Sequence, residues 1–259
     1  MDELLYKVHC RECLDFMQEL PPNSIDVILT DPPYFAPAQH YQSRISWGRC
    51  FGDLSILGQA FFDWCREFKR ILKPDGHLLC FCNDEAYPVF YPVAYGWWDF
   101  TNALIWDKTR VGLGRGFRHQ HEFIIWASNK SAFVNPSCGL HADVLAHPAT
   151  LTKDRIHPVE KPPALLSELL FVVSKEGATI LDPFAGGGST LVAAHRAGLK
   201  WIGCDINQDY CQSIRHRLAE EFGGQFYEDA VTGNGPKNKG NMQSLQGIMD
   251  LVPAEGMSA

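Results

Sequence analysis

The chain has 259 residues, of which 46% are hydrophobic and 20% charged, a composition typical of soluble globular proteins. It has no run of about 18 apolar residues that could span a membrane, and residues 1–5 lack the basic start of a secretory signal. Nine cysteines are too few for a disulfide scaffold, so we expect reduced thiols in a cytoplasmic protein. The net charge of −7 excludes a protein that coats nucleic acid through its overall charge.

Short β-branched runs alternate with segments of helical apolar spacing in the first half of the chain. The predicted elements there are, in order, a strand at 4–9, a helix at 12–20, a strand at 25–30, a helix at 54–72 and a strand at 77–82. The Lys-Pro-Asp-Gly sequence at 73–76 is expected to end the second helix. Residues 35–53 are expected to form a polar loop ahead of that helix.

The second half continues the alternation after an irregular, polar insertion at 129–156. The predicted elements are strands at 102–106 and 122–127, a helix from Pro162 and Pro163 to Gly177, a strand at 178–181, a helix at 189–197, a strand at 201–204 and a helix at 209–222. Residues 223–259 have little to bury and are expected to be a disordered tail. The alternation predicts a single α/β domain over residues 1–222 with a mostly parallel sheet.

Two cysteine pairs have spacings that could supply zinc ligands. They are Cys10 with Cys13, and Cys80 with Cys82. The second pair lies in an apolar run, where a buried cysteine behaves as a small hydrophobic residue. We therefore expect no metal site.

A glycine-rich turn, Gly186–Gly188, separates a predicted strand that ends at Asp182 from a helix. Glycines let the backbone approach a ligand, and the following helix N-terminus favours an anion. No lysine follows the glycines as in a P-loop, and Leu191 stands where a dinucleotide site needs its third glycine. Asp205 ends the next strand, where a carboxylate can bind a ribose. A ribose with an amino-acid carboxylate indicates S-adenosylmethionine; a structural turn with Asp205 as a helix N-cap is the alternative.

The strand at 25–30 ends in Asp31, Pro32, Pro33 and Tyr34. The exocyclic amine of a nucleobase is a poor nucleophile, and chemistry on it needs acceptors for both N–H bonds. The Asp31 carboxylate and the Pro32 carbonyl can supply them, because prolines fix the backbone and donate no hydrogen bond. Tyr34 offers a face on which a flipped base can stack. A simple Asp-Pro-Pro turn is the alternative.

These two motifs together resemble the amino-group DNA methyltransferases, which modify adenine N6 or cytosine N4, and their order resembles the permuted β group. His157–Pro162 is similar to the family's His-Pro-x-x-Lys-Pro, which lines the methionine end of the cofactor. Residues 105–108 and 117–122 are similar to the hairpin that borders the target-base pocket. The resemblance spans about residues 4–222 and implies a Rossmann-like, doubly wound fold.

The resemblance implies a set of residues that bind S-adenosylmethionine. They are Glu12, His157, Lys161, Pro162, Asp182, Phe184, Gly186, Gly188, Ser189, Thr190 and Asp205. Glu12 is included because the family has Gly-Asp where this chain has Arg11 and Glu12. A second departure is Val159-Glu160 in place of the usual Thr-Gln.

The expected partner is DNA. Residues 107–160 carry seven basic and five acidic side chains, a local charge of +2 in a chain of −7. Loop arginines chiefly hold phosphates. The candidates for DNA contact are Arg110, Arg115, Phe117 and Arg118.

The sequence thus predicts an S-adenosylmethionine-dependent methyltransferase of a restriction-modification type that acts on adenine N6, because Asp as the first tetrapeptide residue favours adenine in the family. Cytosine-N4 methylation, RNA or protein-amide methylation, and an inactive nucleic-acid-binding module stay open. The sequence also leaves open a homodimer and a restriction partner.

Overall fold

The computed structural model describes residues 1–34, 53–112, 115–149 and 160–223. Its centre is an eight-stranded sheet in the order β1-β8-β7-β2-β3-β5-β4-β6. The strands are Val8–Cys10 (β1), Ile25–Thr30 (β2), Leu72–Cys82 (β3), Phe100–Asp107 (β4), His121–Ser128 (β5), Val144–Ala146 (β6), Thr179–Asp182 (β7) and Lys200–Asp205 (β8). Neighbouring strands pair in parallel except where β5 meets β3 and β4. The predicted single α/β domain with a mostly parallel sheet is confirmed.

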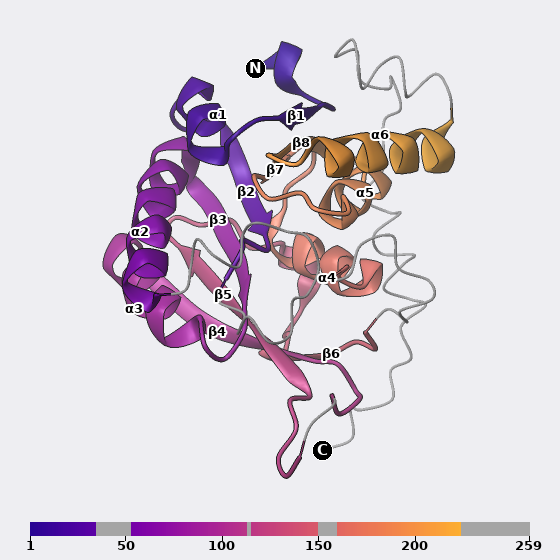
Figure 1. Cartoon of the computed structure of the whole chain (residues 1–259). Helices are drawn as coiled ribbons and strands as arrows, with labels where there is room; N and C mark the ends of the chain where they lie inside the picture. The colour runs from indigo at the N-terminus through magenta and orange to yellow at the C-terminus, as the bar shows by residue number, and fades with distance from the viewer. Residues whose placement is uncertain (35–52, 113–114, 150–159, 224–259) are drawn as a thin grey trace.

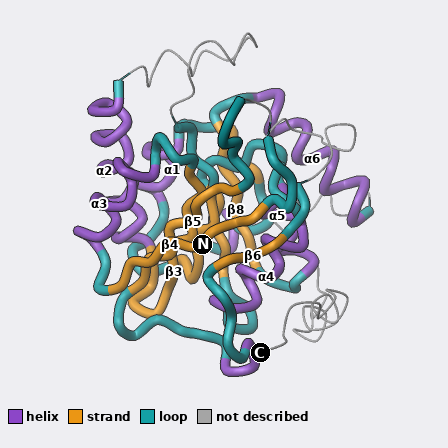
Figure 2. Tube along the Cα trace, turned by 90° about the horizontal axis from the view of Figure 1, so that it is seen from below, coloured by secondary structure: helices purple, strands orange, loops and turns teal. Residues whose placement is uncertain are grey.

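Helices cover both faces of the sheet, as a doubly wound fold requires (Figures 1 and 2). On one face lie Cys13–Glu19 (α1), Leu54–Ile71 (α2) and Tyr87–Trp97 (α3), and on the other lie Pro163–Val173 (α4), Ser189–Arg196 (α5) and Gln208–Phe222 (α6). The central strand β2 is buried along its whole length. Its Ile28 packs in the core under α1–α3, whereas Val27 and Leu29 pack in the core under α4–α6. A strand buried on both faces needs a continuous apolar run, which explains its sequence.

The sheet order brings the predicted motifs to one edge. Strands β2, β7 and β8 are consecutive neighbours and run parallel, so their carboxyl ends meet at the same side of the sheet. Asp31 follows β2, whereas Asp182 and Asp205 end β7 and β8. Residues separated by more than 150 positions in the sequence are thereby brought close together.

Two predicted elements differ from the structure near strand ends. The strand expected at 4–9 is only Val8–Cys10, because Asp2–Leu4 forms a 3-10 helix and Tyr6 has a φ of 58°. The expected break at 73–76 is not a break between elements, because β3 begins at Leu72, directly after α2. Leu72 pairs with Ile25 and His77 with Val27, so the residues between them form an irregularity within the strand.

Three other differences concern helices and the irregular insertion. Helix α3 was not predicted, since Pro88 and Pro92 argue against a helix; Pro88 lies in the first turn, where no N–H is needed. Within the polar segment at 129–156, Val144–Ala146 forms β6 beside β4, and Pro136–Cys138 forms a 3-10 helix. Helix α4 ends at Val173, earlier than the expected stop at Gly177, which instead has a φ of 70° in the turn before β7.

Several expectations fall outside the described residues. These are the loop at 35–53 except Asp53, which caps α2, the site residue His157, and the tail at 223–259 except Gly223. Among the helices of the described part, none is both long and apolar enough to cross a membrane. Cys80 and Cys82 are fully buried in β3, as their apolar run predicts.

Candidate active site

Asp31 lies at the carboxyl end of β2 with one of its carboxylate oxygens bound by a lysine. Its Oδ2 is 2.7 Å from the Nζ of Lys161, and its Oδ1 is buried with no hydrogen-bond partner among the described residues. Pro32 is buried and Tyr34 is half-buried against the core under α1–α3. The tetrapeptide therefore presents a carboxylate with one acceptor unused.

Lys161 links Asp31 to the β4–β5 hairpin. Its Nζ is 2.9 Å from Oε2 of Glu122, at the start of β5, and Oε1 of Glu122 is 2.6 Å from the Nζ of Lys108. The rings of Phe81 and Trp106 lie 4.8 and 5.8 Å from the same lysine nitrogen. The sequence assigned Lys161 to the cofactor; the structure places its ammonium on Asp31 and Glu122.

The charges of this cluster oppose the effect of burial. Burial raises the pKa of Asp31 above its usual range, and the positive charge of Lys161 counteracts part of that rise. Burial would also raise the pKa of Glu122, but the two neighbouring lysines hold that pKa below its usual range. For Lys161, burial would lower the pKa, yet the two carboxylates more than compensate and raise it. Lys161 and Glu122 are therefore an ionised pair next to Asp31.

The glycine turn between β7 and α5 has left-handed backbone conformations. Gly186 has a φ of 50° and Gly188, which caps α5, has a φ of 76°. A Cβ on Gly188 would lie 2.8 Å from a side-chain carbon of Ile214 in α6. Glycine is thus required there by both backbone conformation and space.

Asp205 holds the glycine turn from the next strand. Its Oδ2 accepts a hydrogen bond from the N–H of Gly186 at 2.9 Å, and its Oδ1 accepts one from the N–H of Asn207 at 2.8 Å. Burial raises its pKa. Asn207, not Asp205, is the N-cap of α6, so the structural alternative considered for Asp205 is wrong in that detail.

Glu12 caps α1 at the same edge of the sheet. Its Oε2 accepts hydrogen bonds from the N–H groups of Leu14 and Asp15, at 2.7 and 3.0 Å. The preceding residue, Arg11, donates its N–H to the carbonyl of Asp205. Glu12 therefore lies near the predicted cofactor site with its carboxylate in a helix cap.

Asp182 ties the end of β7 to the end of β2. Its Oδ1 accepts hydrogen bonds from the hydroxyl of Thr30 at 2.8 Å and from the N–H of Phe184 at 3.2 Å. Phe184 in turn packs edge-on against Trp64 of α2, and Ser189 and Thr190 are buried in the first turn of α5. Burial is the main cause that raises the pKa of Asp182, to about 7.

Replacing Asp182 by Asn is expected to flatten the pH dependence of stability. Because the folded pKa of about 7 is above the unfolded value, the folded state binds the proton more tightly, and this group makes the free energy of unfolding fall as the pH rises from about 4 to about 7. Asn keeps an acceptor for Thr30 and Phe184 but does not titrate. Urea unfolding of both proteins at pH 4.5, 6 and 7.5 measures the difference. Parallel curves for the two proteins would contradict the prediction.

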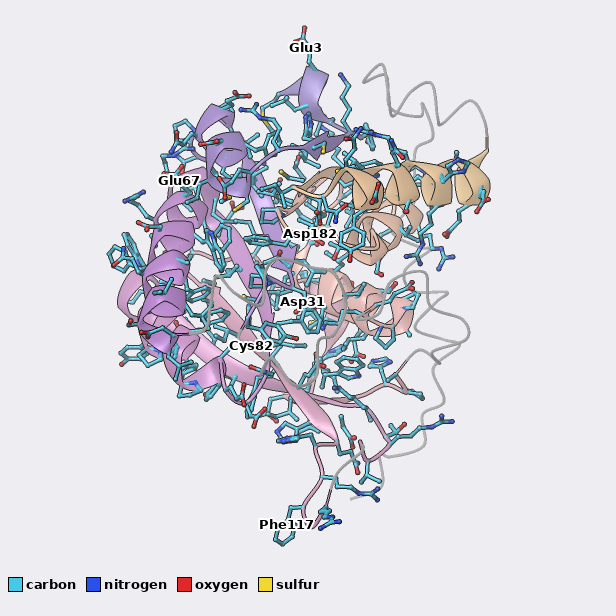
Figure 3. The ribbon with its side chains drawn as sticks, in the orientation of Figure 1. Glu3, Asp31, Glu67, Cys82, Phe117 and Asp182 are labelled. Carbon is cyan, nitrogen blue, oxygen red and sulfur yellow. The ribbon has the colours of Figure 1, made fainter. Side chains whose placement is uncertain are left out.

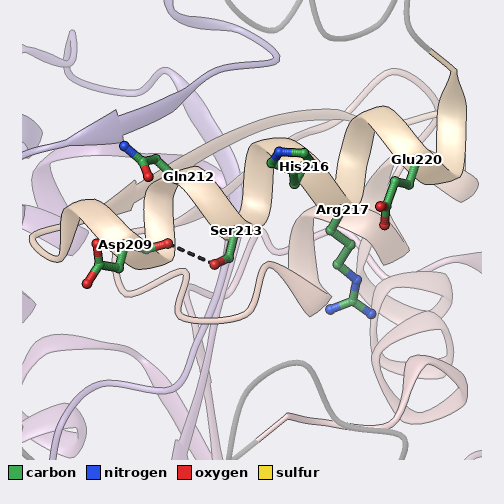
Figure 4. Close-up of a pocket in the computed structure, with 6 residues that line it drawn as sticks. All are labelled: Asp209, Gln212, Ser213, His216, Arg217 and Glu220. Carbon is green, nitrogen blue, oxygen red and sulfur yellow. Dashed lines mark hydrogen bonds between the residues drawn. The ribbon is translucent and has the colours of Figure 1, made fainter.

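Arg217 of α6 is a site residue that the sequence reasoning missed. Its Nη1 donates to the carbonyl of Gly187 at 2.8 Å, and its Nη2 is 2.6 Å from Oε1 of the buried Glu160. Figure 4 shows Arg217 on α6 among the residues that line a pocket there. The departure to Glu160 was the available signal, since a buried acid beside a motif requires a cationic partner.

The candidate DNA-contacting residues lie at the far end of the β4–β5 hairpin. Arg110, Arg115, Phe117 and Arg118 are exposed, Phe117 completely so. Figure 3 shows Phe117 at the tip, well away from Asp31 and Asp182. The structure thus separates these four residues from the catalytic edge but joins them to it through the strands that carry Lys108 and Glu122.

The residues at this edge fit S-adenosylmethionine by their chemistry. The turn has no Cβ at Gly186, Gly187 or Gly188, and the first turn of α5 has N–H groups without helical partners that favour a carboxylate. Asp205 and Glu12 place carboxylates at the ends of the neighbouring β8 and β1, where ribose hydroxyls can be bound. The unused Oδ1 of Asp31 lies at the end of the strand beside β7.

Comparisons with known proteins agree with this geometry. A family model described as DNA methylase (N6_N4_Mtase) matches residues 25–147 and 141–216. YubD of Escherichia coli (strain K12), named as a methylase, is 30% identical over 215 residues, which cover 80% of this chain and 88% of that protein.

Solved structures share the fold. The DNA modification methylase TTHA0409 of Thermus thermophilus, in complex with S-adenosylmethionine, has a TM-score of 0.65 at 20% identity, covering 83% of this chain and 93% of that one. The PvuII DNA methyltransferase, cytosine-N4-specific, has a TM-score of 0.64 at 16% identity, covering 88% and 93%. The family match spans most of the chain, in agreement with its motifs, and the chain therefore belongs to the N6/N4 amino-group DNA methylase family.

Proposed function

We propose that this protein transfers the methyl group of S-adenosylmethionine to the exocyclic N6 of adenine in DNA. The observation that carries the proposal is the unused Oδ1 acceptor of Asp31, presented at the sheet edge that also holds the glycine turn and Asp205. DNA methylation and S-adenosylmethionine as methyl donor follow from the family to which the chain belongs. The choice of adenine is the part that goes further.

The protein's part in the reaction is to orient the amine. Asp31 Oδ1 accepts one N–H of the target amine and the Pro32 carbonyl accepts the other, so that the nitrogen lone pair faces the donor. Tyr34 stacks on the base after it has left the helix. Holding two reactants at attack distance replaces a bimolecular encounter and contributes several kcal/mol, on the order of 7–11 at most.

The bound cofactor supplies an activated methyl group on sulfur. Asp182, Asp205 and the glycine turn hold its binding site in shape, and we propose that Glu12, His157, Pro162, Phe184, Ser189 and Thr190 line it. No covalent intermediate with the enzyme is needed. Cys80 and Cys82, the thiols nearest Asp31 on β3, are fully buried, and burial raises the pKa of both, so neither suits a nucleophile.

Adenine is favoured over cytosine by the residue that begins the tetrapeptide, Asp31, because Asp at this position resembles the adenine-modifying members. We assign the exposed Arg110, Arg115, Phe117 and Arg118 to DNA contact, where arginines on the hairpin loop bind phosphates. The negative net charge restricts such contact to local basic surface.

Mass spectrometry of nucleosides tests the proposal directly. DNA from a methylation-deficient bacterium, incubated with the protein and S-adenosylmethionine and then digested, is expected to contain N6-methyladenine. N4-methylcytosine in its place would assign the cytosine reaction, which uses the same chemistry. The absence of both products, with cofactor binding intact, would reveal an inactive binding module.

A further inference from the structure

The ammonium of Lys161 is enclosed on all the sides that the described residues define. Its side chain is only 7% exposed, two carboxylates contact its Nζ, and the faces of two aromatic rings lie within 6 Å. Its family motif suggests a contact with the cofactor, yet its hydrogen bonds go to Asp31 and Glu122. A different role is therefore required for it.

The two oxygens of Asp31 differ in their surroundings. Lys161 donates to Oδ2, whereas Oδ1 is buried and has no partner in the described part of the chain. An unpaired buried acceptor costs stability, so its persistence points to a ligand. Because Lys161 binds one oxygen, rotation of the carboxylate is restricted and the other oxygen keeps its direction.

Lys161 is itself anchored from the hairpin side. Glu122 binds it with Oε2 and binds Lys108 with Oε1, so four alternating charges run from β2 to β4. The side chains of Glu122 and Asp31 are 17% and 19% exposed, which limits screening by solvent. The same strands, β4 and β5, lead to the hairpin tip with its exposed arginines.

We propose that Lys161 is a positioning residue for methyl transfer: it fixes Oδ2 of Asp31 so that Oδ1 receives the target amine, and Glu122 anchors it to the hairpin. This inference rests on the proposed methylation of an amino group. It gives Lys161 a role distinct from cofactor binding, and it predicts effects on catalysis without effects on cofactor affinity.

The groups that surround Asp31 allow the sign of a pH effect to be worked out. Lys161 provides the positive charge and Glu122 and Asp182 the negative ones, whereas the Cys80 and Cys82 thiols stay neutral because burial raises their pKa; the hydroxyl of Tyr34 also contacts Asp31. Loss of Lys161 removes the charge that favours the ionised carboxylate, which raises the pKa of Asp31. Loss of the Glu122 charge removes a repulsion and lowers it.

The experiment measures kcat/KM against pH and the Kd for S-adenosylmethionine by calorimetry, with DNA from a methylation-deficient bacterium as substrate. Lys161→Met is expected to lower kcat about 100-fold at pH 7, to move the acid limb of the profile to higher pH, and to leave the Kd within about twofold. Glu122→Gln is expected to move the acid limb to lower pH. Lys161→Arg, which keeps the charge, is expected to restore most of the profile.

Lys175→Met is the matched control. Lys175 pairs with the buried Asp26, which lies on the same strand as Asp31 but at its opposite end, so the control removes a similar ion pair away from the site. Its pH profile is expected to match that of the wild type. If Lys161→Met fails to fold, the direction of the Glu122→Gln shift decides the matter.

A weakened Kd in Lys161→Met with an unchanged acid limb would overturn the inference and return Lys161 to the cofactor site. Shifts of the same sign in Lys161→Met and Glu122→Gln would also overturn it. Failure of the proposed function is distinguishable, because the wild-type protein would then methylate no base at any pH.

Discussion

Asp31→Ala is expected to reduce methyl transfer by about 10³-fold, the magnitude seen when one preorganised polar group is removed from an active site. Affinity for S-adenosylmethionine should change by less than about twofold, since no hydrogen bond or ion pair in the described part of the chain joins Asp31 to the glycine turn or to Asp205. Single-turnover transfer of a labelled methyl group, beside calorimetry with the cofactor, measures both quantities. Lys161 keeps Glu122 as a partner in this variant, so the ammonium is not left unpaired.

Asp31→Asn separates the acceptor from the shape of the side chain. Lys161 can only donate, so it binds the amide oxygen and the NH₂ group takes the position of Oδ1. A donor then faces the N–H of the target amine, and activity is expected to fall as far as in the alanine variant. Substantial turnover by either variant would remove Asp31 from its assigned role.

Gly186→Val is expected to weaken binding of S-adenosylmethionine by about 10- to 100-fold. Gly186 has a φ of 50°, where a β-branched residue is strained by about 1–3 kcal/mol, and each 1.4 kcal/mol is a factor of ten in affinity. Relief of that strain moves the turn and disturbs the hydrogen bond from its N–H to Asp205. Calorimetry with the cofactor gives the Kd.

Gly177→Val is the control for backbone strain alone. Gly177 has a φ of 70°, and a Cβ there would meet no atom within 4 Å. It lies in the turn before β7, at the end of the strand opposite to the glycine turn. Both variants should lose stability, but only Gly186→Val should lose cofactor affinity. Equal Kd values for Gly186→Val and the wild type would refute the placement of the cofactor.

The local pattern of the chain was sufficient for most elements. β2 and α2 were predicted because their residues are uniformly apolar or recur at helical spacing, and α5 and α6 because a glycine turn and Asn207 mark their starts. Helix α3 was missed, since two prolines outweigh its pattern locally while packing of Phe90 and Ala94 against the sheet stabilises it. Tertiary packing overrode propensity there.

By itself the sequence determined the alternation of strands and helices, the Asp-Pro-Pro-Tyr tetrapeptide, the glycine turn and the family, because these depend on residue type and on spacing along the chain. Only the tertiary structure decided the partners of the charged groups: Lys161 on Asp31 and Glu122, Asp182 on Thr30, and Arg217 on Glu160. These pairs join residues 39 to 152 positions apart. The physical reason is that a buried charge takes whichever opposite charge the sheet order brings near it, and that order is set by packing across the whole domain.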